Sequence, residues 1–299
     1  LWRRFCHQAE AAESENSRYY IRIGVAFVRA KNVSVSQALY DELIYYGKYA
    51  PTYPKAPCQI PPKGTVVQGY ANADPATEMT LFRADGDKEL VMAFPGTSSL
   101  QDFLTDVSAT LVPYVSPGVN CSACQIHKGV LTSWNNIQPQ AKKVLDDAIA
   151  AYPSYKFKIV GHSLGGALTK LAYTSFAGQG YKVAAAYSYG EFRTGNPATS
   201  DMVDKLSGNT DQNQGPYHRI THADDGVPQV LTTQQGFRHS RTEYWFSIGA
   251  DPTITYRCYG QEPSDCNNSQ LAVGVFGINA AHVFYPGVNV TGCGGFTPS

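Results

Sequence analysis

The chain has 299 residues, of which 43% are hydrophobic and 16% are charged, with 24 basic and 24 acidic side chains. This length suits one large α/β domain or two small ones. The balanced charge gives no electrostatic reason to expect nucleic acid as a partner, and the lack of a run of about 18 apolar residues argues against a membrane-spanning helix.

The first part of the chain mixes charged and aromatic side chains without a clear period, so we expect residues 1–33 to be an N-terminal extension of unclear role. Apolar residues at helical spacing then predict a helix over 36–49. The side chains expected on its buried face are Ala38, Leu39, Leu43, Tyr46 and Tyr49. A proline-rich segment follows, and two short strands are predicted at 79–83 and 89–94.

The middle of the chain alternates helical and strand-like patterns, beginning with a helix over 127–151. The elements predicted after it are strand 155–160, helix 164–177, strand 182–189, helix 198–206, strand 217–221, strand 243–248 and strand 253–259. Strands that alternate with helices imply a mainly parallel sheet with helices on its faces. Because no internal repeat or linker interrupts the pattern, we expect residues 34–299 to form a single domain.

The most informative segment is Gly161-His162-Ser163-Leu164-Gly165, which lies between a predicted strand and a predicted helix. In this context Gly-x-Ser-x-Gly is the nucleophile elbow of α/β-hydrolases, a sharp turn that lifts the serine hydroxyl clear of the sheet. We therefore expect an α/β-hydrolase fold with Ser163 as the nucleophile. Adjacent side chains diverge in such a turn, so we interpret His162 as structural and not as the base.

In this fold the acid and the base follow the serine in that order, on loops after later strands. Asp224 and Asp225 follow the predicted strand 217–221, and spacing alone does not choose between them. The histidines beyond this acid are His239 and His282. Position favours His282, which we place in a loop near the end of the chain.

Acyl transfer also needs hydrogen-bond donors directed at the oxygen on which negative charge develops. The backbone N–H of Leu164 is one expected donor, and the loop after the predicted strand 89–94 should supply another. In that loop Thr97 can offer its N–H and its hydroxyl. An ordinary Pro-Gly turn is the alternative interpretation.

An amphipathic pattern follows this loop directly, and its apolar face consists of Leu100, Phe103, Leu104 and Val107. We interpret it as a short helical lid that covers the site in water and binds lipid when open. A helix packed permanently on the core would give the same pattern, so both interpretations stay open.

Cysteines and glycosylation sequons both indicate an oxidising, secretory environment. The seven cysteines predict a disulfide framework, although their spacing does not give the pairing. Only Cys121 and Cys124 have zinc-ligand spacing, and no second pair matches them, so we expect no metal site. Four sequons agree with secretion. Their asparagines are Asn32, Asn120, Asn267 and Asn289.

Taken together, the motifs resemble the class 3 lipase family of filamentous fungi, which also includes feruloyl esterases. The matching segments keep the order of that family between residues 36 and 295. They are Phe94-Pro-Gly-Thr-Ser-Ser, His127-Lys-Gly-Val-Leu-Thr-Ser-Trp, Val160-Gly-His-Ser-Leu-Gly-Gly-Ala, Tyr189-Gly-Glu-Phe-Arg-Thr-Gly-Asn-Pro, Arg219-Ile-Thr-His-Ala-Asp-Asp-Gly-Val-Pro and Glu243-Tyr-Trp.

The resemblance implies a role for each candidate site residue. It makes Ser163 the nucleophile, Asp225 the acid and His282 the base. It also implies that Thr97 lines the oxyanion hole and that Asp106 braces the hydroxyl of that threonine.

The same resemblance assigns residues 98–108 to the lid region and suggests how the cysteines pair. The implied disulfides are Cys58–Cys293, Cys121–Cys124 and Cys258–Cys266, which leaves Cys6 unpaired.

These observations favour a secreted carboxylic ester hydrolase that needs no cofactor, and in particular a triacylglycerol lipase acting at a lipid–water interface. The apolar lid face favours water-insoluble acylglycerols, whereas a polar lid would favour soluble aromatic esters. The alternatives are a feruloyl esterase, a mono- or diacylglycerol lipase and, from another class, a non-catalytic lipid-binding relative. The sequence does not indicate an oligomeric state.

Overall fold

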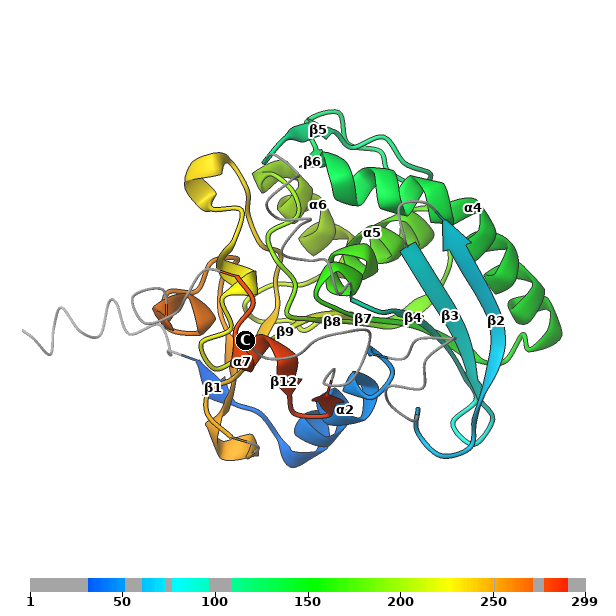
Figure 1. The fold of residues 1–299 in the computed structure, drawn as a ribbon, viewed down its shortest axis with the longest axis horizontal. Coiled ribbons are helices and arrows are strands. Elements are labelled where there is room, and N and C mark those ends of the chain that lie inside the picture. Colours follow the sequence, from blue (N-terminus) through cyan, green and yellow to red (C-terminus); the bar gives the residue numbers. More distant parts are fainter. Residues whose placement is uncertain are drawn as a thin grey trace, which may run out of the picture.

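The computed structural model describes residues 32–51, 61–73, 77–96, 109–249, 251–270 and 277–289. Within these ranges a nine-stranded sheet forms the middle layer (Figure 1), in the order β1-β11-β10-β9-β8-β7-β4-β3-β2. In that order the strands are Val33–Ser34, Thr255–Cys258, Glu243–Phe246, Tyr217–His222, Val183–Tyr189, Lys156–His162, Glu89–Phe94, Thr77–Ala84 and Thr65–Ala73.

The centre of the sheet is parallel and its edges are antiparallel. Strands β4, β7, β8, β9 and β10 run parallel to one another, while β3 and β2 extend one side and β11 and β1 the other in antiparallel pairs. This confirms the predicted α/β-hydrolase architecture. Strand β2 was not predicted, because a register shift between Val67 and Gly69 interrupts the two-residue period that marks a strand.

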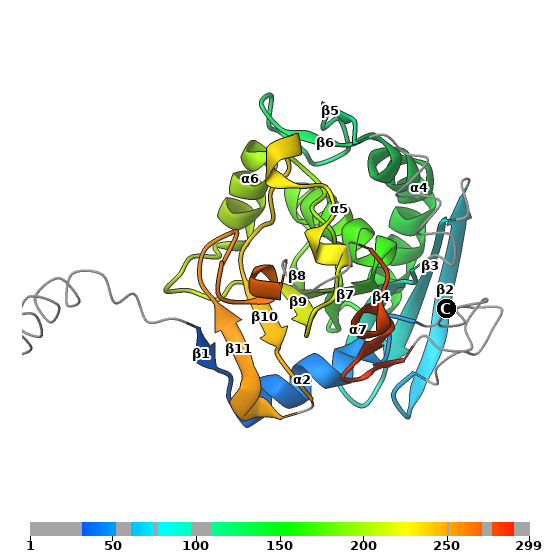
Figure 2. The same cartoon turned by 60° about the vertical axis from the view of Figure 1, so that its left-hand side comes forward.

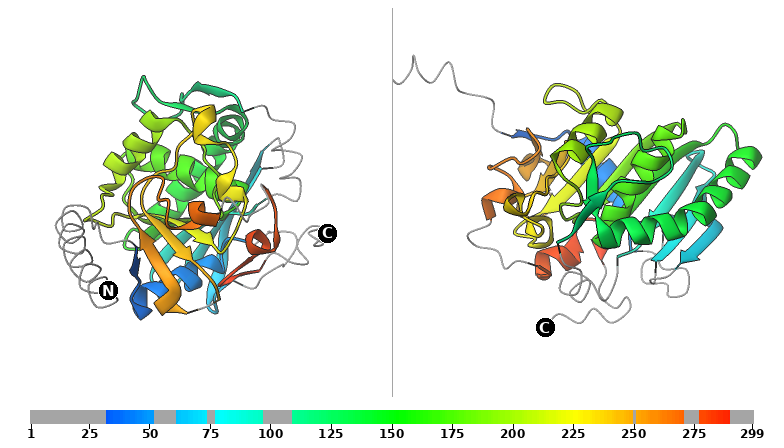
Figure 3. Two further views of the ribbon diagram at one scale, coloured as in Figure 1. Left: turned by 90° about the vertical axis from the view of Figure 1, so that its left-hand side faces the viewer. Right: turned by 90° about the horizontal axis from the view of Figure 1, so that it is seen from above.

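Helices cover both faces of the sheet (Figures 2 and 3). On one face lie α4 (Lys128–Ala151), α5 (Leu164–Gly178) and α6 (Pro197–Ser207). On the other lie α2 (Gln37–Gly47), α7 (Ala280–Val283) and the hairpin of β12 (Phe284–Tyr285) and β13 (Val288–Asn289). A second hairpin, β5 (Leu111–Pro113) and β6 (Gln125–His127), precedes α4. The 3-10 helices are η1 (Val227–Gln229), η2 (Thr233–Gln235), η3 (Pro252–Ile254) and η4 (Asn267–Gln270).

Each face of the sheet has its own hydrophobic core. On α4 the apolar side chains that recur at helical spacing from Val130 to Ala148 are buried, apart from the half-buried Val144. On α2 the predicted face was partly wrong, because Ala38 is exposed and Tyr40 is buried against Phe246, with ring centroids 5.7 Å apart. The helix still packs closely, since Tyr46 stacks on Tyr187 at 4.4 Å.

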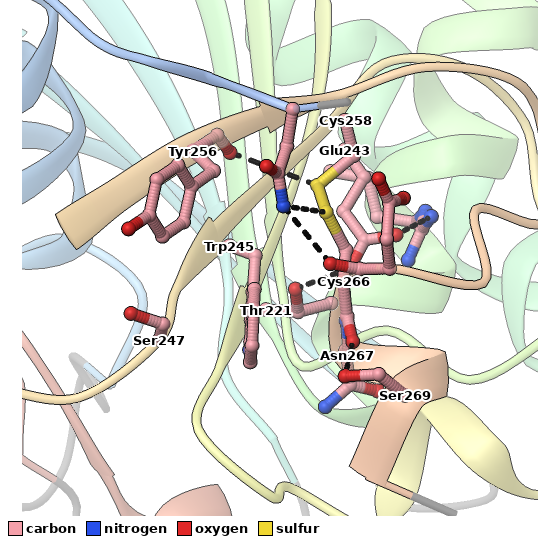
Figure 4. The surroundings of a disulfide bond; sticks show 12 residues. Thr221, Glu243, Trp245, Ser247, Tyr256, Cys258, Cys266, Asn267 and Ser269 are labelled. Atoms are coloured by element: carbon pink, nitrogen blue, oxygen red, sulfur yellow. Dashed lines mark hydrogen bonds and ion pairs between the residues drawn. A yellow bond between two sulfur atoms is a disulfide. The ribbon is translucent and has the colours of Figure 1, made fainter. Parts of the chain in front are cut away.

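Two of the expected disulfides are present in the described residues. Cys121–Cys124 lies within the loop between β5 and β6, and Cys258–Cys266 joins the end of β11 to the residue before η4 (Figure 4). The pair expected between Cys58 and Cys293, and the unpaired Cys6, lie outside the described residues. Among the helices in those residues, none has both the length and the apolar character needed to cross a membrane.

Candidate active site

Ser163 occupies the turn between β7 and α5. Its backbone has φ 61° and ψ −124°, a conformation that costs about 1–3 kcal/mol for a residue with a side chain. Two backbone hydrogen bonds hold the turn: the N–H of Ser163 donates to the carbonyl of Tyr189 at 2.8 Å, and the N–H of Ala167 donates to the carbonyl of Ser163 at 3.2 Å. The neighbouring strand therefore helps to keep the serine in its strained position at the carboxyl edge of the sheet.

Close packing around the turn requires glycine at positions 161 and 165, on either side of the serine. A Cβ added to Gly161 would lie 2.1 Å from the carbonyl oxygen of Gly165. A Cβ added to Gly165 would lie 2.0 Å from the carbonyl oxygen of Phe94, at the end of β4. Any larger residue at either position would push α5 away from the sheet, and the serine with it.

The structure brings together three side chains that are far apart in the sequence. The Nε2 atom of His282 lies 2.9 Å from Oγ of Ser163, and its Nδ1 atom lies 3.1 and 3.0 Å from the two carboxylate oxygens of Asp225. All three side chains are buried. The resulting hydrogen-bonded series places a hydroxyl, an imidazole and a carboxylate in the geometry that activates a serine nucleophile.

Of the two adjacent aspartates, Asp225 is the one that faces His282. Its Oδ1 also accepts a hydrogen bond from the N–H of Val227 at 2.9 Å, and its Oδ2 accepts one from the hydroxyl of Tyr285. Asp224 instead contributes its backbone carbonyl, which accepts from the amide of Asn279 at 2.8 Å. The choice that spacing left open is made by the turn after β9.

The surroundings of Asp225 favour its ionised form. Burial raises the pKa of this carboxyl, but the charge of His282 and the hydrogen bonds from His282, Tyr285 and Val227 outweigh burial and hold the pKa below its usual value. Burial and the neighbouring carboxylate raise the pKa of Tyr285 well above its ordinary value. The tyrosine therefore stays protonated and donates.

His282 lies in the short helix α7 and not in the loop that we expected. Asn279 caps this helix, because its Oδ1 accepts the N–H of His282 at 3.1 Å. The amide of the same asparagine binds the carbonyl of Asp224. Asn279 thus ties the segment that carries His282 to the loop that carries Asp225.

Two further residues shape this site and were not identified from the sequence. Tyr285, three positions after His282, donates to Asp225. Gly190 follows β8 with φ +57°, and a Cβ there would lie 2.9 Å from Cε1 of His282 and 3.2 Å from Oδ2 of Asp225. The sequence signals for the glycine were its place directly after a buried strand and its inclusion in the segment Tyr189-Gly-Glu-Phe that resembles the family.

The remaining histidine candidates have other partners. His162 is buried, its Nε2 donates to the backbone carbonyl of His282 at 2.9 Å, and the two rings lie 4.6 Å apart. Burial, with a smaller contribution from the charge of His282, lowers the pKa of His162 to about 3, so this ring is neutral. His239 donates from Nε2 to the carbonyl of Pro228 at 2.9 Å and has no contact with Ser163 among the described residues.

The loop after β4 approaches the serine closely. A Cβ added to Gly96 would lie 3.2 Å from Cβ of Ser163, and Leu164 begins α5, whose first N–H groups have no acceptor within the helix. The other residues expected at the oxyanion hole and in the lid lie outside the described residues. They are Thr97, Leu100, Phe103, Leu104, Asp106 and Val107. Within the described ranges no cluster of His, Cys, Asp and Glu side chains could hold a metal ion.

The chain is similar to known lipases. A family profile described as "Lipase (class 3)" matches residues 91–235. The chain is 31% identical over 221 residues to a lipase of Rhizomucor miehei, which covers 73% of this chain and 57% of the relative. It is also 33% identical over 166 residues to the secreted mono- and diacylglycerol lipase A of Penicillium cyclopium. This aligned segment covers 56% of this chain and 50% of that protein.

A solved structure extends the likeness over most of the chain. The triacylglyceride lipase of Rhizomucor miehei superimposes with a TM-score of 0.73 at 26% identity, covering 87% of this chain and 98% of that one. The chain spans about half the length of the curated relatives that it matches.

Proposed function

Because the chain belongs to the class 3 lipase family, we propose that it is a triacylglycerol lipase that hydrolyses glyceride esters at a lipid–water interface. The observation that carries this proposal is the hydrogen-bonded series from Oγ of Ser163 through His282 to the carboxylate of Asp225. Such a series activates a serine for attack on an ester carbonyl without any cofactor.

In the proposed first step, His282 takes the proton from Ser163 as Oγ attacks the ester carbonyl. Asp225 stays ionised, orients the imidazole through Nδ1 and stabilises the imidazolium that forms. His282 then gives the proton to the departing alcohol, which leaves an acyl group on Ser163. Water, deprotonated by the same imidazole, attacks this acyl-enzyme and releases the fatty acid.

Negative charge develops on the carbonyl oxygen in both steps. We assign the N–H of Leu164 as one oxyanion donor, because it lies at the start of α5, directly after the nucleophile. We assign Thr97 as the other through its N–H and hydroxyl, with Asp106 bracing that hydroxyl. Each donor of this kind contributes about 3 kcal/mol of transition-state stabilisation.

The lid proposal concerns residues 98–108, next to the proposed oxyanion loop. We propose that the apolar side of this segment covers the site in water and contacts lipid when it opens. A lipase with such a lid is expected to show a rise in activity when a triglyceride substrate forms an interface. A series of tributyrin concentrations that crosses the solubility limit tests this, and a smooth saturation curve without a break contradicts it.

A mono- and diacylglycerol lipase is the second candidate, because a relative at 33% identity carries that name. A hydrolysis panel of tributyrin, triolein, monoolein, a phospholipid and methyl ferulate separates the candidates. Hydrolysis of monoolein without hydrolysis of triolein would favour the second candidate, and preference for methyl ferulate would favour a feruloyl esterase.

We also propose that the protein is secreted and that residues 34–299 act as a single domain, with residues 1–33 as an extension. Disulfides at 121–124 and 258–266 support an oxidising compartment. A relative whose name includes "secreted" supports the same location. Detection of the protein and its esterase activity in the culture medium of its source tests this.

The nucleophile assignment is tested by Ser163→Ala, with Ser175→Ala in the following helix α5 as a matched control. The hydroxyl of Ser175 binds the carbonyl of Pro117 and lies away from the site. We expect only Ser163→Ala to abolish both nitrophenyl ester hydrolysis and labelling by a fluorophosphonate. Wild-type turnover in Ser163→Ala would exclude the mechanism, and a wild-type protein that reacts with neither reagent would indicate a non-catalytic relative.

A further inference from the structure

Asn267 binds the loop that carries Asp225. Its side chain is 2% exposed, and its amide Nδ2 donates to the backbone carbonyls of Ala223 and Asp225, both at 3.2 Å. Its Oδ1 accepts from Nε2 of Gln229 at 2.6 Å. Every polar atom of this side chain is therefore used inside the protein.

The loop that Asn267 contacts needs such support. Ala223 has φ 40°, a left-handed conformation that disfavours a residue with a Cβ. Nε1 of Trp245 also donates to the carbonyl of Ala223, at 3.0 Å. The hydrogen bonds of Asn267 join both ends of the turn, from Ala223 to Asp225, and so fix the direction in which the carboxylate of Asp225 leaves the backbone.

Asn267 is in turn fixed to the sheet. It directly follows Cys266, whose disulfide with Cys258 joins it to β11, as Figure 4 shows. Its backbone N–H donates to the carboxylate of Glu243 at 3.3 Å. That carboxylate is buried and is held by Arg219 at 2.7 Å and by the hydroxyl of Thr221 at 2.6 Å. Contacts with β9, β10 and β11 therefore fix the position of Asn267.

We propose that Asn267 is a positioning residue, which holds the main chain of residues 223–225 so that the carboxylate of Asp225 faces His282. This inference rests on the proposed function, because it assigns Asn267 a part in ester hydrolysis. It also means that Asn267 of the sequon Asn267-Asn268-Ser269 has a structural role and is not expected to be glycosylated, because a glycan on its amide would break the hydrogen bonds to the loop.

The substitution that tests the proposal is Asn267→Asp, which keeps the size of the side chain but loses both N–H donors to the loop. We expect kcat for a soluble nitrophenyl ester to fall about 10- to 100-fold, with KM changed less than about twofold, because sub-ångström displacement of a catalytic group acts on the reacting geometry and not on binding.

Ser269→Ala is the matched control. It destroys the same sequon but leaves the amide of Asn267 in place, because the exposed Ser269 hydroxyl donates to the carbonyl of Cys266 at 2.6 Å and accepts from Nε2 of Gln270 at 2.9 Å, and neither bond involves the Asn267 side chain. We expect wild-type kcat and KM. If Asn267→Asp does not fold, Gln229→Met is measured instead, since it removes the hydrogen bond that orients the Asn267 amide, and a smaller fall in kcat is expected.

Four results would overturn the inference: unchanged kcat in folded Asn267→Asp, a change in KM alone, the same loss in Ser269→Ala, or unchanged kcat in Gln229→Met when Asn267→Asp is unfolded. Ser163→Ala is measured in parallel. Turnover that survives Ser163→Ala refutes the proposed function itself. An inactive Ser163→Ala beside a fully active Asn267→Asp refutes only the role of Asn267.

A separate observation concerns Asn120. This residue is exposed in the loop between β5 and β6, and its side chain makes no hydrogen bond within the part of the chain that the structure describes. By contrast, the amide of Asn32 donates to the carbonyl of Asp265 at 2.9 Å. We infer that Asn120 is the glycan acceptor among the sequon asparagines whose side chains are described.

Secretion of the chain from a yeast host, followed by peptide mass mapping with and without an endoglycosidase, tests this inference. We expect glycan on the peptide that contains Asn120 and loss of one glycan mass in Asn120→Gln, while Ser269→Ala keeps the wild-type glycan mass. An unmodified Asn120 in the secreted protein, or a glycan on Asn267, would overturn it.

Discussion

Gly190→Ala is expected to damage catalysis far more than its small size suggests. A Cβ at this position would lie 2.9 and 3.0 Å from Cε1 and Nδ1 of His282 and 3.2 Å from Oδ2 of Asp225. The imidazole would have to move by a few tenths of an ångström, and because a 1 Å misplacement can cost about 100-fold in rate, we expect kcat to fall about 10-fold. The positive φ of 57° adds about 1–2 kcal/mol of destabilisation.

Gly208→Ala separates these two effects. Gly208 has φ +70° and ends α6, and a Cβ there would meet nothing closer than Nδ2 of Asn213 at 3.7 Å. Both variants should lose stability in urea unfolding, because each puts a Cβ at a positive φ, but only Gly190→Ala should lose kcat on a soluble nitrophenyl ester. Equal kcat values for the two variants would refute the reasoning that the Cβ displaces the imidazole.

Three further predictions concern stability. Tyr285→Phe leaves the buried carboxylate of Asp225 with one hydrogen-bond donor fewer, so the free energy of unfolding measured in urea should fall by about 1.5–3 kcal/mol. An unchanged midpoint of urea unfolding would show that this hydrogen bond does not stabilise the fold. Burial lowers the pKa of His127, the N-cap of α4, to about 4. The pKa of a histidine in the unfolded chain is near 6.5, so between pH 6.5 and pH 4 the unfolded chain binds more protons than the folded one, and the free energy of unfolding falls as the pH falls. In His127→Asn the loss of this free energy between pH 7.5 and pH 5 should be smaller than in the wild type by about 2 kcal/mol. Equal losses in the two proteins would contradict this prediction. Replacing Cys258 and Cys266 by serine opens a short loop and should lower stability by about 2–3 kcal/mol, measured against the reduced and oxidised wild type.

The sequence predicted the parts of this protein that depend on local pattern. The alternation of strands and helices gave the layered fold, since burial on one helix face or inside a parallel sheet leaves a short-range signal. The turn around Ser163 could be predicted for the same reason, because its flanking glycines are required by close contacts with residues a few positions away and with the adjacent strand β4. The order of the three site residues followed from the topology of the fold.

The sequence could not predict contacts that depend on the path of a turn or on distant segments. Spacing could not choose between the chemically identical neighbours Asp224 and Asp225, and only the family resemblance pointed to Asp225, whose side chain leaves a turn in which Ala223 has a positive φ. Tyr285 and Asn267 reach the same carboxylate loop from segments that follow it by more than 40 residues. Nothing in their own sequence surroundings marks these side chains as part of the site.

The four-residue helix α7 has a consequence for behaviour on heating. One turn of helix has no stability of its own, and its place is kept by side chains from other segments: Asn279 at its start, His222, which binds the carbonyl of Ala281 at 3.0 Å, and His162, which binds that of His282. Warming should release this turn while the large sheet is still intact. Hydrolysis would then cease below the melting temperature and return on cooling, so that residual activity measured in a cooled sample would overstate the working range of the hot enzyme.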